Sequence, residues 1–262
     1  MSDLKINLAL DPQTGRHVDI LGNGRFLMAL CQASYLPLDQ FHSAAVSLGM
    51  SITASADPSD PAFWALCRSD HAAVFVHRGS ANESNWLHDF EFIQIDNPIG
   101  AGMVHQGFCD SIHPQWPMMD TLARSLAPVV AGGDPIVITG HSFGAARAIL
   151  QAAWLNAEGA VSVDSVYTFG GPRVGNREFA GAYAPANTIR FVHKDDIVPR
   201  LPPILNYRHV GMLAYLDDSA TCRLGGKMPI DLVPLTQVGQ FVADHTTYVA
   251  ALNAAQAMEA QS

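Results

Sequence analysis

The sequence has no apolar run of about 18 residues or more, the length that a membrane-spanning helix needs. Basic residues are also scarce, since 15 Lys and Arg stand against 24 Asp and Glu, for a formal net charge of −9. Binding to nucleic acid requires clustered Lys and Arg against phosphates, so we do not expect a nucleic-acid partner. Electrostatic docking to anionic membranes is disfavoured, whereas insertion of apolar side chains into a lipid surface stays open.

Cysteine is the second scarce residue type. The chain has no Cys-x-x-Cys pair and no His-Glu-x-x-His motif, so we expect no metal site and no cofactor.

The first seven residues lack a basic stretch followed by an apolar run, which predicts no cleaved signal peptide and, by default, a cytoplasmic protein. Secretion by another route, or a sequence given without its leader, stays open. The four cysteines are widely spaced: Cys31, Cys67, Cys109 and Cys222.

The remaining composition, 48% hydrophobic and 15% charged, is typical of a compact globular protein. No internal repeat or long linker is visible, so we expect a single domain over residues 1–262. Strand-like and helix-like segments alternate, which predicts an α/β fold with a mostly parallel sheet covered by helices on both faces. Residues 217–238 are expected to be irregular. The expected strands are 71–77, 90–96, 135–139, 161–169, 188–192 and 207–216, and the expected helices are 25–34, 117–126, 145–155 and 244–258.

The most informative segment is Gly140-His141-Ser142-Phe143-Gly144. A β-branched run precedes it and strong helix formers follow it, so the serine falls in a strand–turn–helix corner. A Cβ two residues before or after the serine would collide with the neighbouring strand or helix, which explains both glycines. This pattern predicts the nucleophile elbow of α/β-hydrolases. An ordinary βα turn that contains Gly, Ser and Gly is the alternative.

A serine hydroxyl needs a base to accept its proton and an acid to orient that base. In this fold the acid and then the histidine follow the serine along the chain. Asp195 and Asp196 directly follow a strand, and we favour Asp196, although spacing alone does not separate them. His245 is favoured over His209, because it lies where the last helix is expected to start, whereas His209 falls in a strand-like run and is expected to pack in the core.

An oxyanion hole is also required for acyl transfer. Its first donor is the backbone N–H after the nucleophile, here that of Phe143. The second comes from the loop after an earlier strand, where Ser80 can donate through its backbone and its hydroxyl. Four histidines near expected strand ends are candidates to line the cleft: His77, His105, His141 and His193.

Several separate blocks, taken together and in this order, resemble the class 3 lipases, also called fungal-type triacylglycerol lipases. The pentapeptide at residues 140–144 alone would be weak evidence for a family, but an ordered set of blocks is specific evidence. The blocks are residues 77–80, 85–89, 104–108, 140–144, 168–176, 195–203 and 244–245.

The resemblance implies Ser142 as nucleophile, Asp196 as acid and His245 as base. It selects Asp196 over its neighbour because the family's acid directly precedes an aliphatic-Val-Pro sequence, here Ile197-Val198-Pro199. It implies an oxyanion hole of Ser80 and Phe143, although Phe143 replaces the leucine that is common there. It also implies a short amphipathic helical lid over residues 83–90 and substrate contacts from Trp86, Leu87, Phe90 and His141.

These residues predict a serine carboxylester hydrolase that acts on lipid esters, either triacylglycerols or shorter acyl esters. The apolar residues of the implied lid favour lipid and a lipid–water interface. A phospholipase and an aryl (feruloyl-type) esterase are alternatives on the same fold. A catalytically silent binding protein and a toxin-like phospholipase held inactive by a partner are further alternatives.

Overall fold

The structure is a computed structural model that describes residues 6–9, 17–80, 91–185, 187–228 and 243–260. Its centre is an eight-stranded sheet in the order β1-β2-β3-β6-β7-β8-β9-β10. The pairs from β3 through β9 are parallel, and the pairs toward β1 and β10 are antiparallel. The strands are β1 (Ser51–Ser55), β2 (Trp64–Arg68), β3 (Ala73–His77), β6 (Ile136–His141), β7 (Ser165–Phe169), β8 (Thr188–His193), β9 (Met212–Leu216) and β10 (Cys222–Leu224).

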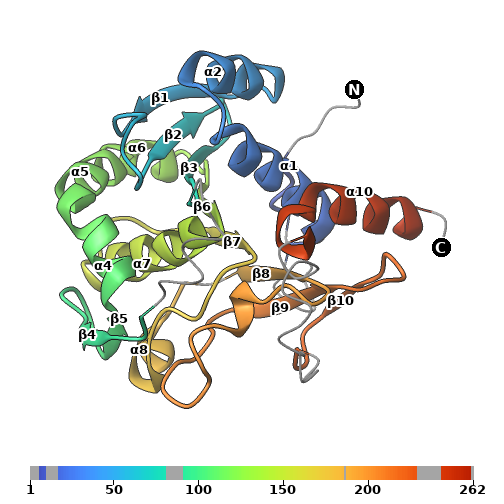
Figure 1. The fold of residues 1–262 in the computed structure, drawn as a ribbon. Helices are drawn as coiled ribbons and strands as arrows, with labels where there is room; N and C mark the ends of the chain where they lie inside the picture. Colours follow the sequence, from blue (N-terminus) through green and yellow to red (C-terminus); the bar gives the residue numbers. More distant parts are fainter. Residues whose placement is uncertain (1–5, 10–16, 81–90, 186, 229–242, 261–262) are drawn as a thin grey trace.

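Helices cover both faces of this sheet (Figure 1). Helices α1 and α10 lie side by side on one face, where the Arg25 guanidinium donates to Asn253 at 2.7 Å. Helix α7 packs on the other face. The helices are α1 (Ile20–Ala33), α2 (Leu38–Ser47), α4 (Gln106–Ile112), α5 (Trp116–Ser125), α6 (Ala127–Ala131), α7 (Phe143–Ala157), α8 (Arg177–Ala182) and α10 (Tyr248–Glu259). Two short strands, β4 (Gln94–Asp96) and β5 (Met103–His105), form a separate ribbon.

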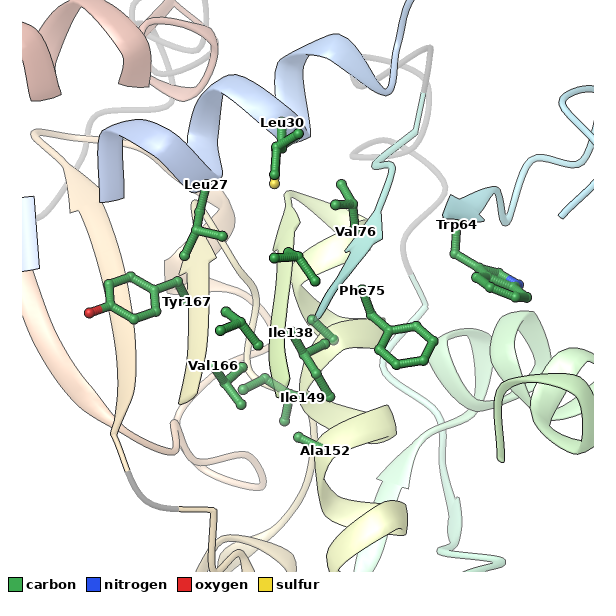
Figure 2. Close-up of a cluster of buried hydrophobic side chains, with 14 of the residues drawn as sticks. Leu27, Leu30, Trp64, Phe75, Val76, Ile138, Ile149, Ala152, Val166 and Tyr167 are labelled. Carbon is green, nitrogen blue, oxygen red and sulfur yellow. The ribbon is translucent and has the colours of Figure 1, made fainter. Parts of the chain in front are cut away.

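The core explains why the central strands have continuous apolar runs. Every residue of β6 is buried, because α1 and α7 enclose this strand from both sides. Figure 2 shows Leu27 and Leu30 of α1 on one side of the sheet and Ile149 and Ala152 of α7 on the other. The mostly parallel α/β sheet that the sequence predicts is confirmed.

Several expected boundaries are wrong, in two strands and in the last helix. The strand expected over 207–216 begins only at Met212, and the one expected over 161–169 begins at Ser165. The stretch 217–238, expected to be irregular, contains β10, and its residues 229–238 lie outside the described part. The last helix is divided, since a helical turn at 243–246 is separated from α10 by Thr247.

Among the described residues, no helix combines the length and the apolar character needed to span a bilayer.

Candidate active site

Ser142 lies in the corner between β6 and α7, with φ 57° and ψ −127°. A positive φ at a residue other than glycine costs about 1–3 kcal/mol, so the surrounding structure must hold it. The Ser142 N–H donates to the Phe169 carbonyl at 2.9 Å, which ties the corner to the end of β7. The Ser142 side chain is buried, and its Oγ has no hydrogen-bond partner among the described residues.

The glycines around the serine are explained by close backbone contacts. A Cβ on Gly140 would lie 2.3 Å from the Gly144 carbonyl oxygen, and one on Gly144 would lie 2.2 Å from the His77 carbonyl oxygen. A Cβ on Gly79 would lie 3.0 Å from the Ser142 Cβ. Because these positions lack side chains, the loop after β3 lies directly against the serine corner.

Asp196 and His245 form a buried pair at the same edge of the sheet. The His245 Nδ1 and the Asp196 Oδ2 are 2.8 Å apart, and their side chains are 2% and 0% exposed. Asp196 Oδ1 accepts the Val198 N–H at 2.9 Å, and Oδ2 also accepts the Tyr248 O–H at 2.7 Å. These donors fix the carboxylate, so it holds the imidazole in one orientation.

The structure separates the two aspartates and the two histidines that sequence spacing left open. Asp195 forms an ion pair with Arg200 at 3.2 Å, and its side chain is 44% exposed. The His209 Nε2 lies 2.7 Å from the Pro199 carbonyl oxygen, as expected for a packed histidine. Of the two aspartates, Asp196 is thus bonded to His245, whereas Asp195 is ion-paired to Arg200.

Two further contacts bring the Asp196–His245 pair to the serine corner. A Cβ on Gly170 would lie 2.7 Å from both the Asp196 Oδ2 and the His245 Nδ1, and Gly170 directly follows the Phe169 carbonyl that holds Ser142. The rings of His141 and His245 also have centroids 4.6 Å apart. The three sequence-predicted residues therefore lie near one another at the sheet edge formed by the carboxyl ends of β6, β7 and β8.

His141 is buried beside the Asp196–His245 pair. Its Nε2 lies 3.0 Å from the His245 carbonyl oxygen, and its Nδ1 lies 3.0 Å from the Tyr35 hydroxyl. Burial, and then the proximity of His245, lower the pKa of His141 to about 3, so the ring is neutral. A carbonyl only accepts, so Nε2 donates and Nδ1 accepts the Tyr35 O–H. Both ring nitrogens are bonded within the protein, which fits a positioning residue better than a substrate contact.

Arg147 forms a second buried polar group, beside the residues from which the oxyanion-hole donors are expected. Arg147 is fully buried; its Nη2 donates to the Arg78 carbonyl, and its guanidinium lies 5.6 Å from the centre of the Phe143 ring. The His77 Nε2 lies 2.7 Å from the Gln151 Oε1. Arg147 therefore contacts both segments from which the donors are expected, the start of α7 and the loop that leads to Ser80.

Acid is expected to destabilise the fold through buried neutral histidines, among them His77 and His141. Burial, and then Arg147, lower the pKa of His77 to about 3, as burial does for His141. A histidine with a lowered folded pKa stabilises the fold fully above the ordinary pKa of about 6.5, and this stabilisation is lost as the pH falls toward 3. The free energy of unfolding should fall by up to about 1.4 kcal/mol per pH unit for each ring.

Urea unfolding followed from neutral pH down to about pH 4 measures this slope. His77→Gln is expected to reduce the slope, whereas His42→Gln, at an exposed position of α2, should leave it unchanged. A flat stability profile across that range would contradict the burial of neutral rings at both positions.

The implied lid and its substrate contacts lie outside the described residues. They are residues 83–90, with Trp86, Leu87 and Phe90.

A strained serine at a strand-to-helix corner, with a buried Asp–His pair at the same edge of a mostly parallel sheet, defines the α/β-hydrolase class. Residues 74–206 match a family model described as Lipase (class 3). The chain belongs to the class 3 lipase family.

Characterised relatives and solved structures agree with this family. The chain is 37% identical over 147 residues to a secreted mono- and diacylglycerol lipase of Fusarium solani, covering 53% of this chain and 42% of that protein. It is 32% identical over 186 residues to secreted mono- and diacylglycerol lipase A of Penicillium cyclopium, covering 69% and 59%. The chain thus spans about half the length of the curated relatives it matches.

The fold is shared with solved fungal lipases. A crystal structure of the Penicillium cyclopium enzyme aligns with a TM-score of 0.73 and 25% identity, over 91% of this chain and 98% of that chain. A triacylglycerol lipase whose catalytic centre is described as a serine protease triad aligns with a TM-score of 0.70 and 24% identity, over 88% and 95%.

The prediction of a cytoplasmic protein is contradicted, since the relatives from Fusarium and Penicillium are named secreted lipases. That prediction depended on the lack of a signal-peptide pattern in the first seven residues and on the scarce cysteines. Neither feature determines the compartment, because a hydrolase of this size is stabilised by its hydrophobic core without disulfides.

Proposed function

We propose that this chain is a secreted serine carboxylester hydrolase that acts on lipid esters, and that Ser142, Asp196 and His245 are its catalytic residues. The observation that carries the proposal is the buried Asp196–His245 pair beside the strained serine corner. The names of the relatives, mono- and diacylglycerol lipases, support acylglycerols as the substrate class.

The chemistry follows from this arrangement. The Ser142 Oγ attacks the ester carbonyl while the His245 Nε2 accepts its proton, and Asp196 stabilises the imidazolium through Nδ1. The backbone N–H groups of Phe143 and Ser80 stabilise the oxyanion of the tetrahedral intermediate. His245 then protonates the leaving alcohol, and a water molecule deprotonated by the same ring releases the acyl group as a carboxylic acid.

Substrate access is proposed to involve residues 83–90. Ser142 has no exposed surface, so an ester reaches it only after a movement of the chain. Trp86, Leu87 and Phe90 are spaced along the sequence as the apolar face of a short helix, which suits contact with a lipid surface. A lipid–water interface would then favour the open form.

A panel of esters measured below and above their solubility limits tests this function. We expect hydrolysis of monoacyl- and diacylglycerols, with a rise in rate once the substrate forms a separate phase. Ser142→Ala protein in the same emulsions controls for spontaneous hydrolysis. Faster turnover of phosphatidylcholine would instead favour a phospholipase. Smooth saturation with feruloyl esters as the best substrates would favour an aryl esterase.

A further inference from the structure

A second polar site lies on the α7 face of the sheet. It is a small cavity whose polar lining comes from Thr168, Arg190 and His209, and whose apolar lining includes Ala145 and Ile149 of α7. Successive residues of a strand point to opposite faces. Phe169 and Phe191 stack at 5.2 Å, on the face where Phe169 also contacts Tyr248 of α10. Their neighbours Thr168 and Arg190 therefore point away from the Asp196–His245 pair, toward α7.

Two N–H donors of the Arg190 guanidinium lack a protein partner in the described part of the chain. Its Nε and Nη1 atoms are buried and donate to no acceptor there, while the side chain as a whole is half-buried. Its cross-strand neighbours are Thr168 on β7 and Leu213 on β9, and neither carries a carboxylate. Burial, and then the nearby Arg173, lower the pKa of Arg190 to about 10, so it remains charged at neutral pH.

The other charges near this cavity are positive as well. Arg173 donates from Nη1 to the carbonyls of Arg200 and Pro202, and in the described part of the chain it forms no ion pair with Asp or Glu. Burial, followed by Arg190 and Arg173, keeps the pKa of His209 well below its ordinary value. Asp195, five residues after Arg190 along the chain, is bound to Arg200. The charged groups that act on Arg190 and His209 are therefore positive.

Buried N–H donors are nearly always hydrogen-bonded, so the Nε and Nη1 donors of Arg190 require an acceptor that the described residues do not supply. We propose that the cavity binds a small monovalent anion, chloride, on the free donors of Arg190. The cavity has about 10 Å³ of free volume, roughly the space of one water-sized particle, which favours a single-atom ion over phosphate. The bound ion would link β8 to the first turns of α7, and this role is independent of the proposed function.

Melting temperatures in chloride, with gluconate replacing it at constant ionic strength, test the proposal. Binding to the folded state should raise the wild-type melting temperature by about 3 °C for each tenfold chloride increase above the dissociation constant. Arg190→Met should lose this response. In gluconate it should melt no lower than the wild type, because an apolar side chain replaces an unpaired charge.

Two further variants sharpen the test. Arg124→Met removes an arginine that is exposed and paired with Asp120 and Glu158, and it should keep the wild-type chloride response. Leu213→Glu places a carboxylate on the strand position paired with Arg190, and it should abolish the response by supplying an internal counter-charge.

An equal chloride response in the wild type and in Arg190→Met, or none in the wild type, would overturn the proposal. Crystals of the wild-type protein soaked in bromide give an answer even where the variants fail to fold. An anomalous peak within hydrogen-bond distance of Arg190 is expected. Density for water alone at that position would refute anion binding.

Discussion

Ser142→Ala is expected to lower kcat for p-nitrophenyl ester hydrolysis by about 10⁶-fold, because the nucleophile of an acyl-enzyme mechanism is removed. The fold should survive the change. The Ser142 Oγ has no hydrogen-bond partner among the described residues, so its removal leaves no new unsatisfied group. Initial rates, together with circular dichroism and the melting temperature, separate loss of chemistry from loss of structure.

Ser165→Ala is a matched control for this experiment. Ser165 is also fully buried, and its Oγ likewise has no partner in the described part of the chain, but it lies at the start of β7, away from the elbow. This variant should keep wild-type turnover. A fluorophosphonate should label Ser142 in the wild type and in Ser165→Ala, but not in Ser142→Ala. Turnover above about 1% of wild type in Ser142→Ala would refute the nucleophile.

Local sequence patterns were sufficient to predict the central strands of the sheet and the strand–turn–helix corner at Ser142. β6 is apolar throughout because helices cover both its faces, and such a strand is recognisable from the sequence alone. The glycines at 140 and 144 likewise mark backbone contacts closer than 2.5 Å for a Cβ. Strands β1 and β2 were missed, because they are short antiparallel strands whose partners are set by tertiary contacts.

The residues around the site were less predictable, since their roles depend on contacts between distant segments. At helical spacing Arg147 and Gln151 form one polar face of α7 with Glu158, yet Arg147 and Gln151 are fully buried. Tyr248, three residues after His245, bonds to Asp196 from the first position of α10, and no local pattern indicated this. The substrate contact of His141 stays a prediction, and no sequence pattern indicated that its ring nitrogens contact the Tyr35 hydroxyl and the His245 carbonyl.

The Arg190 cavity could not be predicted from the sequence for the same reason. An arginine in a strand is ordinarily paired across the sheet or points to solvent. Its lack of a partner depends on Leu213, which lies beside it only once β8 and β9 pair in parallel. Because Arg173 and Leu213 are distant from Arg190 in the sequence, neither the neighbouring positive charge nor the lack of a counter-charge could be predicted.

Asp196→Asn is expected to lower kcat by about 10⁴-fold with little change in KM. The carboxylate accepts from the His245 Nδ1, the Val198 N–H and the Tyr248 O–H. An amide in the same place offers one acceptor oxygen and an NH₂ group that cannot accept from any of these donors. The imidazole then loses the tautomer that leaves Nε2 free to take the serine proton, and its positive form loses its stabilising charge. Steady-state kinetics on a soluble ester measures both constants.

Asp195→Asn is the closest possible control, since it makes the same chemical change one residue earlier. Asp195 contacts Arg200 through an ion pair whose acid is 44% exposed, and such pairs contribute about 0–1 kcal/mol. Its effect on kcat should therefore be small. An equal loss of kcat in the two variants would contradict the assignment of Asp196 as the acid that supports the basicity of His245. A loss in Asp195→Asn alone would contradict it as well.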